Sequence, residues 1–218
     1  MSGTFRNILS PANKARVVEL LKGNRASVTR RGHKRAAVLV PMFTQVGKDA
    51  PEILFTIRSS TLTHHRGQVS FPGGVMDEGD QSLVDTALRE TEEELGINPE
   101  QVTVWGCLPA MPDREGTASI VPVLGSLGEF DPASIIRNED EVEEAFHLSV
   151  QHLSNPVNHS YTRFSKPLSS LHFPVFHGGP SRIWGLTGFI LDTVLSLVLP
   201  SEVNYQMISD RYPHVGQR

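Results

Sequence analysis

Runs of apolar residues predict several short strands in the first half of the chain. The run 36–41 is continuously apolar, as expected for a strand buried on both faces. In 52–58, every second residue is apolar, which predicts a second strand. A third short strand is predicted at 68–71 and ends at Pro72-Gly73-Gly74, residues that are typical of a turn.

A helical pattern follows at 81–95, where apolar residues recur every three or four positions. Asp80 is the predicted N-cap, because a short carboxylate can accept the free backbone N–H groups of the first turn. Gly96 occupies the position after the helix that favours a left-handed residue, and Pro99 lies just beyond it. These signals predict a helix with defined ends.

The remaining pattern alternates strands and helices. We predict strands at 101–109, 119–125 and 170–176, a strand or helix edge leading into a short helix within 141–153, and an amphipathic helix at 184–199. Strands interleaved with helices favour an α/β fold, in which a mixed β-sheet is sandwiched between α-helices (α/β/α).

Length and composition are those of one ordinary globular domain. The 218 residues suit a single α/β domain, predicted at 36–200, with an extension at 1–35 and a tail at 201–218. A net charge of −4 argues against a general nucleic-acid partner, and no apolar segment is long enough to span a bilayer. Because Cys107 is the single cysteine, no internal disulfide can form, which favours a reducing compartment.

The N-terminal segment is unusually basic. Before Lys48, nine Lys and Arg residues stand against one acidic residue, Glu19. An Arg-rich, acid-poor N-terminus is typical of a mitochondrial targeting signal. The apolar residues within 15–21 equally predict a basic surface helix, and the sequence leaves both interpretations open.

Three glutamates of the central helix are candidate metal ligands. Glu90, Glu93 and Glu94 are three or four residues apart, so they share one side of a helix. Like charges at this spacing repel, and hard carboxylate oxygens without histidine or cysteine favour Mg²⁺ or Mn²⁺. Arg89 is placed to orient one carboxylate as an outer partner. The alternative is a solvated acidic face, which the helix alone would favour.

The context of the helix strengthens the metal hypothesis. Gly73 and Gly74 precede it, and a backbone without side chains can approach a phosphate closely. A tight turn is the simpler explanation of two glycines. A glycine pair followed by a helix with clustered glutamates nevertheless predicts a site for a metal and a pyrophosphate.

The segment 74–97 resembles the Nudix box. Residues 89–97 read Arg-Glu-Thr-Glu-Glu-Glu-Leu-Gly-Ile, close to the second half of that motif. Thr91 replaces an aliphatic residue whose packing its methyl group can supply. Eight residues rather than seven separate Asp80 from Arg89, so Asp80 is not counted among the ligands. The upstream run 54–74, which ends in Gly-Gln-Val-Ser-Phe-Pro-Gly-Gly, resembles the signature of the coenzyme A diphosphatase branch, most closely of its mitochondrial members.

The resemblance implies a Nudix fold and a metal-dependent diphosphatase. Its substrate would be coenzyme A and its thioesters, cut to 3′,5′-ADP and 4′-phosphopantetheine with the acyl group kept on the latter. Glu90 and Glu94 would bind the metal, and Glu93 would act as a ligand or as the base. Glu141 is a second candidate base, although a solvated acid is the simpler interpretation. The residues expected to hold the substrate are Arg58, His65, Arg66, Gln68, Gly73 and Gly74.

Rival functions remain at this point. Another Nudix substrate, such as NADH or ADP-ribose, would fit the box alone, and a Nudix-fold binding module would need no catalysis. We expect a small-molecule substrate, no nucleic acid, no membrane, and a monomer or homodimer. Mitochondrial localisation is expected, with peroxisomal or cytosolic residence as alternatives.

Overall fold

A computed structural model describes residues 5–23, 34–60, 67–113, 115–166, 169–203 and 205–207. Its centre is a mixed eight-stranded sheet with the order β3-β2-β1-β7-β5. Three further strands lie off this path, where β4 pairs with β1, β6 with β7, and β8 with β2. The strands are β1 Lys34–Gln45, β2 Pro51–Arg58, β3 Val69–Ser70, β4 Gly73–Val75, β5 Thr103–Cys107, β6 Met111–Pro112, β7 Ala118–Phe130 and β8 Val142–Ser149.

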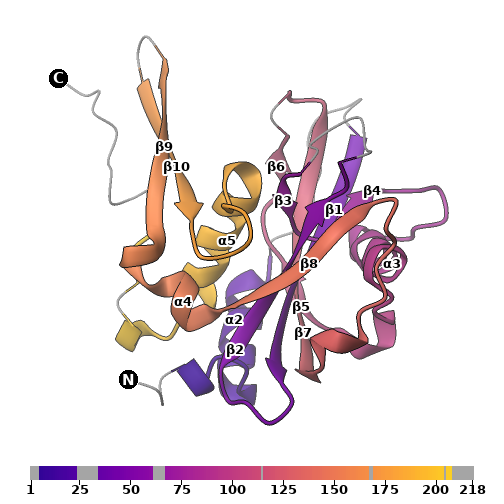
Figure 1. The fold of residues 1–218 in the computed structure, drawn as a ribbon, viewed down its shortest axis with the longest axis horizontal. Coiled ribbons are helices and arrows are strands. Elements are labelled where there is room, and N and C mark those ends of the chain that lie inside the picture. The colour runs from indigo at the N-terminus through magenta and orange to yellow at the C-terminus, as the bar shows by residue number, and fades with distance from the viewer. Residues whose placement is uncertain are drawn as a thin grey trace.

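Helices cover both faces of this sheet (Figure 1). Helix α3 (Leu83–Leu95) packs on one face, and α2 (Pro11–Leu21), α4 (Val150–Ser154) and α5 (Gly185–Val198) lie on the other. Strands β1 and β7 run parallel, whereas the other strand pairs in the sheet are antiparallel. The predicted α/β architecture, a mixed sheet between helices, is therefore confirmed.

Alternation along β2 distributes the core between the two faces. Ile53, Phe55 and Ile57 belong to the larger apolar cluster, which also contains the buried side chains of α5. Leu54 points to the opposite face and packs with Leu95 at the end of α3. Successive side chains of a strand point to opposite faces, so this two-layer core follows directly from the strand pattern.

The basic N-terminal segment contains helix α2, which agrees with the predicted surface helix at 15–21. Val17 and Leu21 of α2 are buried, while Leu20 is exposed. The Asn13 side chain donates to the Val198 carbonyl, and Arg16 donates to the Leu197 carbonyl at the end of α5. Both side chains satisfy carbonyl groups that the end of a helix leaves unpaired.

Two predicted details of the central region are wrong. Helix α3 begins at Leu83, and its N-cap is Ser82, whose hydroxyl accepts from the Asp85 N–H. Asp80 lies too early to cap this helix. Gly73 and Gly74 belong to strand β4, which pairs with β1, and do not form a turn. The predicted C-terminal glycine is confirmed, because Gly96 is left-handed with φ 67°.

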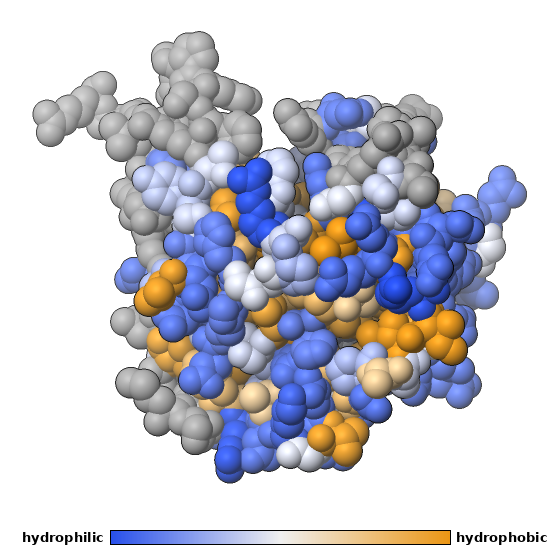
Figure 2. Space-filling view, in the orientation of Figure 1, coloured by the Kyte–Doolittle hydropathy of each residue, from blue (hydrophilic) through white to orange (hydrophobic). Residues whose placement is uncertain are grey.

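Strand β9 (His159–Lys166) was not predicted, because its polar sequence lacks a clear alternation, and it pairs with β10 (Ser169–Phe176). Short 3₁₀ turns complete the chain: η1 Pro99–Gln101, η2 Pro132–Ser134, η3 Pro156–Asn158 and η4 Ser201–Val203. On the face shown in Figure 2, polar residues break the hydrophobic surface into separate patches. Within the described residues, no helix has the length and apolar character needed to cross a membrane.

Candidate active site

The two glycines of β4 allow close contacts on different sides of the strand, with helix α3 at Gly74 and with strand β1 at Gly73. A Cβ atom added at Gly74 would lie 2.5 Å from the Glu90 carboxyl group. At Gly73, where φ is 152°, an added Cβ would lie 2.3 Å from the Ala37 carbonyl oxygen. Only glycine fits at these positions: Gly74 lets the Glu90 carboxyl group lie against the β4 backbone, and Gly73 lets β4 lie close to β1.

Three carboxylates meet beside this strand. Glu90, Glu94 and Glu141 each offer an oxygen, and these oxygens lie within 4.8 Å of one another. Glu90 and Glu94 are one turn apart on α3, as the spacing predicted. Glu141 joins them from the segment before β8, although its sequence context favoured a solvated acid.

Backbone hydrogen bonds hold Glu141 in place. The Asn138 N–H donates to the Glu94 carbonyl (2.9 Å), and the Ile136 N–H donates to the Leu95 carbonyl (3.0 Å). These bonds tie the segment to the carbonyl end of α3. At its other end, the Ser59 N–H donates to the Glu141 carbonyl (2.8 Å), so the segment is also fastened to the end of β2.

The Glu94 side chain is 3% exposed. Burial raises its pKa to about 8; Arg58 opposes this shift, and the carboxylates of Glu141 and Glu90 add to it. The Arg58 guanidinium lies 3.7 Å from Glu94 Oε1. Glu94 Oε2 is buried without a hydrogen-bond partner among the described residues. An unpaired buried carboxylate oxygen is costly, and a bound cation would remove that cost.

Burial also raises the pKa of Glu90, against the opposing effect of Arg89. The candidate ligands Glu90, Glu94 and Glu141 therefore offer carboxylate oxygens. In two of them, Glu90 and Glu94, burial disfavours the ionised form. Mg²⁺ and Mn²⁺ prefer such oxygen ligands. Glu90, Glu94 and Glu141 fit a divalent cation of this kind.

A second charged group surrounds Arg89 on the outer side of the same helix. Its guanidinium contacts Asp80 (2.9 Å), Glu93 (2.9 Å) and Glu90 (3.1 Å). This guanidinium holds the pKa of the Asp80 carboxyl well below its usual range. The Glu93 side chain is 52% exposed and shares the Arg89 guanidinium with Glu90, and among the described residues it is not one of the three carboxylates that lie within 4.8 Å of one another.

The predicted substrate residues that the structure describes lie near the C-terminal end of β2 and on β4. Arg58 ends β2 beside Glu94, and half-buried Gln68 accepts the Arg58 backbone N–H with its carbonyl (3.1 Å). Gly73 and Gly74 line the same side through β4. His65 and Arg66 lie outside the described residues.

Comparison with known proteins identifies the family. The model of the NUDIX domain matches residues 33–167. The chain belongs to the Nudix family. It is 44% identical over 194 residues to the mitochondrial coenzyme A diphosphatase NUDT8 of Mus musculus, covering 88% of this chain and 90% of that protein. The human protein of the same name is 44% identical over 197 residues, covering 88% of this chain and 80% of the relative.

A further relative, Nudix hydrolase 3 of Caenorhabditis elegans, is 34% identical over 188 residues. The match covers 79% of this chain and 76% of the relative. The resemblance to the coenzyme A diphosphatase branch, which residues 54–74 indicated, is thereby confirmed. This Nudix hydrolase carries its box on β4 and α3, the elements that build the carboxylate group.

Proposed function

We propose that this Nudix hydrolase cuts the diphosphate bond of coenzyme A and its thioesters, releasing 3′,5′-ADP and 4′-phosphopantetheine or its acylated form. The observation that carries the proposal is the 44% identity to coenzyme A diphosphatases over 88% of the chain. The buried carboxylate group supports it, because hydrolysis of a diphosphate chiefly requires charge neutralisation and positioning.

Glu90 and Glu94 would hold a divalent cation, Mg²⁺ or Mn²⁺, and the Glu141 carboxylate lies beside them. When bound, this ion would neutralise the diphosphate and lower the pKa of a coordinated water. Arg58 extends toward Glu94 and can donate to a phosphate oxygen. Gln68 and the unobstructed backbone of Gly73 and Gly74 are proposed to position the rest of the diphosphate.

The attacking water must lose a proton as its oxygen bonds to phosphorus and the bridging P–O bond breaks. Glu141 faces α3 from the opposite segment, so its carboxylate is proposed as the proton acceptor in place of Glu93. Glu93 is held by Arg89, and we assign it a positioning role through that arginine. The proton finally reaches the leaving phosphate or solvent.

A product assay tests the proposal. Purified protein is incubated with Mg²⁺ and, separately, coenzyme A, acetyl-coenzyme A, NADH and ADP-ribose, and the products are identified by chromatography and mass. We expect 3′,5′-ADP from the two coenzyme A substrates, and its loss in Glu94→Gln and in chelator. Cleavage of NADH or ADP-ribose with intact coenzyme A would overturn the substrate assignment, and binding without cleavage would favour a non-catalytic module.

We also propose mitochondrial residence, supported by the names of the two relatives and by the basic N-terminal segment. Imaging of the full chain with a C-terminal fluorescent tag tests this location. Coincidence with a mitochondrial marker is the expected result, and a peroxisomal or diffuse cytosolic signal would contradict it.

A further inference from the structure

Asn138 connects two of the three acids of the candidate site. Its backbone N–H donates to the Glu94 carbonyl (2.9 Å), and its side-chain Nδ2 donates to Glu141 Oε1 (3.4 Å). Its carbonyl accepts the backbone N–H groups of Glu141 (3.1 Å) and Val142 (2.8 Å). The half-buried Asn138 is therefore bonded to helix α3 at Glu94 and to both the backbone and the carboxylate of Glu141.

The orientation of the Asn138 side-chain amide follows from its two partners. Oδ1 accepts the Asp140 backbone N–H (3.2 Å), a group that can only donate. The Glu141 carboxylate can only accept when it is ionised, so the NH₂ end of the amide faces it. Flipping the amide would set donor against donor and acceptor against acceptor. Both neighbours therefore require the orientation in which Asn138 donates to Glu141.

The Glu141 side chain needs a contact that holds it in place. One oxygen of its carboxylate lies within 4.8 Å of oxygens of Glu90 and Glu94, and ionised carboxylates this close repel one another. Among the described residues, the Asn138 amide donates the one hydrogen bond that the Glu141 carboxylate accepts. A glutamate side chain has several rotatable bonds, so without this bond the carboxylate is free to turn away from the other two acids.

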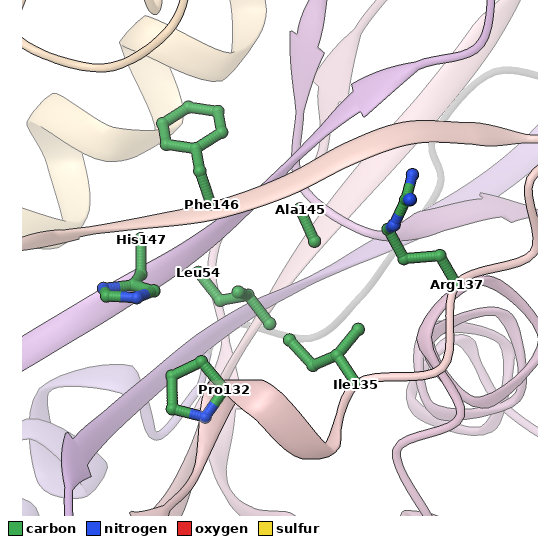
Figure 3. Close-up of a pocket in the computed structure, with 7 residues that line it drawn as sticks. All are labelled: Leu54, Pro132, Ile135, Arg137, Ala145, Phe146 and His147. Carbon is green, nitrogen blue, oxygen red and sulfur yellow. The ribbon is translucent and has the colours of Figure 1, made fainter.

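The backbone that carries Asn138 is held by other contacts as well. Figure 3 shows the Ile135 side chain directed toward Leu54 of β2 and the Arg137 side chain extending toward β8. The Arg137 guanidinium donates to the Val142 carbonyl (3.1 Å) at the start of β8. These contacts do not involve the Asn138 side chain, so a variant that changes only that side chain keeps them.

We propose that Asn138 is a positioning residue, which holds the Glu141 carboxylate in the orientation from which it accepts the proton of the attacking water; this inference rests on the proposed function. The amide occupies Oε1, so Oε2 is the oxygen left to take the proton. In this role Asn138 itself neither gives nor receives a proton. Loss of the amide leaves Glu90 and Glu94 unchanged and misplaces the base, so it lowers kcat more than it changes KM.

Asn138→Ser separates this role from a role in the local turn. Serine keeps an oxygen that can accept the Asp140 N–H, but it has no amide that reaches Glu141. We expect kcat on coenzyme A to fall about tenfold, with KM within about twofold of the wild type. Asn155→Ser is the matched control and should keep the wild-type kcat, because exposed Asn155 accepts the Val157 N–H in a turn of the same length. Equal kcat in the two variants would overturn the inference.

A double-mutant cycle tests whether Asn138 acts through Glu141. In a chain that already carries Glu141→Gln, Asn138→Ser should change kcat by less than about twofold, because the carboxylate that it positions is absent. Losses that multiply would show that Asn138 acts by another route and would overturn the inference. All chains of the cycle are compared well below their thermal midpoints, so that a loss of stability does not enter kcat.

Hydrogen exchange of the Asn138 side-chain amide provides a readout that needs no turnover. Its NMR signals are identified by their loss in Asn138→Ser. The bonded amide proton should exchange with water several times more slowly than those of exposed Asn155, and Glu141→Ala should remove this difference. Equal exchange at both asparagines of the wild type would overturn the inference even if the chain hydrolyses coenzyme A. Failure to cleave any coenzyme A substrate, with slow exchange at Asn138, would instead overturn the proposed function.

Discussion

Helix α3 carries two groups of charged side chains that differ in how their charges are paired. On its outer side, Arg89 is surrounded by Asp80 and Glu93, so every charge there has a partner of opposite sign. On its inner side, Glu90 and Glu94 lie close to a third acid, Glu141. Each of the two has one arginine contact: Arg89 lies 3.1 Å from Glu90, and Arg58 lies 3.7 Å from Glu94. The outer acids share the Arg89 guanidinium, whereas in the inner group Glu94 Oε2 is buried without a hydrogen-bond partner among the described residues, and a bound cation would supply one. On this difference in charge pairing we base the proposal that Glu90 and Glu94 bind the metal and that Glu93 does not.

The largest effect is expected at the most buried acid of the inner group. Glu94→Gln keeps the shape of the side chain but removes its charge, so kcat on coenzyme A should fall by a factor on the order of 10³. Glu92→Gln, an exposed position on the same helix, serves as the matched control. Steady-state kinetics in saturating Mg²⁺ measure both, and similar losses in the two variants would erase the distinction between the groups.

The inner group should also make the metal-free protein sensitive to pH. The pKa of Glu94 is about 8 in the folded protein against an ordinary value of 4.5, so the folded state binds the extra proton. Its stabilising contribution is complete below 4.5 and is lost as the pH rises toward 8, by an amount on the order of a few kcal/mol.

Urea unfolding in chelator at pH 5.5 and pH 8 measures this loss. Glu94→Gln should flatten the pH dependence, and Mg²⁺ should restore the stability of the wild-type chain at pH 8. Equal stability of the metal-free wild type at both pH values would show that burial does not raise the pKa of the Glu94 carboxyl group.

Glu141 should matter more than its acidic neighbours. We expect Glu141→Gln to lower kcat by about 10²-fold if its carboxylate accepts the proton of the attacking water. Glu139→Gln and Glu143→Gln, two exposed acids of the same region, should stay within about threefold of the wild type. Equal rates for all three variants would return Glu141 to the role of a solvated acid.

Breaking the outer group should cost stability first and activity second. Arg89→Gln leaves the Asp80 carboxylate, whose side chain is 5% exposed, without its partner. We expect a loss of about 1–3 kcal/mol in the free energy of unfolding and about tenfold in kcat, because Arg89 also orients Glu90. Denaturant titration and kinetics on one preparation measure both losses. A drop in kcat as large as that of Glu94→Gln, at unchanged stability, would place Arg89 in the inner group.

Much of the frame that carries these groups could be predicted from local sequence. Apolar periodicity located β1, β2 and α3, because each element buries a face that its own residues define. Gly96 marked the end of α3 for a local reason, its left-handed backbone. The sequence predicted Asp80 as the N-cap, whereas the N-cap is Ser82. Both side chains can accept a backbone N–H, and local sequence does not fix at which of them the helix begins.

The site itself depended on contacts between distant segments. Gly73 and Gly74 are in a strand because β4 pairs with β1, and this pairing has no local signal. Glu141 reaches Glu94 only because the 136–141 segment is bonded to the end of α3. Glu93 shares the helical side of Glu90 by spacing, yet its carboxylate accepts from Arg89 and lies outside the group formed by Glu90, Glu94 and Glu141. Sequence spacing therefore predicted candidate ligands on one helix, and contacts with distant segments decide which carboxylates lie close together.

The most direct test of the two-group account is a Mn²⁺ titration of the wild type, Glu93→Gln and Glu94→Gln, with bound ion followed by electron paramagnetic resonance. Both variants replace a carboxyl group on the same turn of α3 by an amide of the same shape, so they are matched in size. We predict that Glu94→Gln weakens binding at least tenfold and that Glu93→Gln stays within about threefold of the wild type. Equal weakening in both variants, or a larger loss in Glu93→Gln, would contradict the assignment of the metal to the inner group.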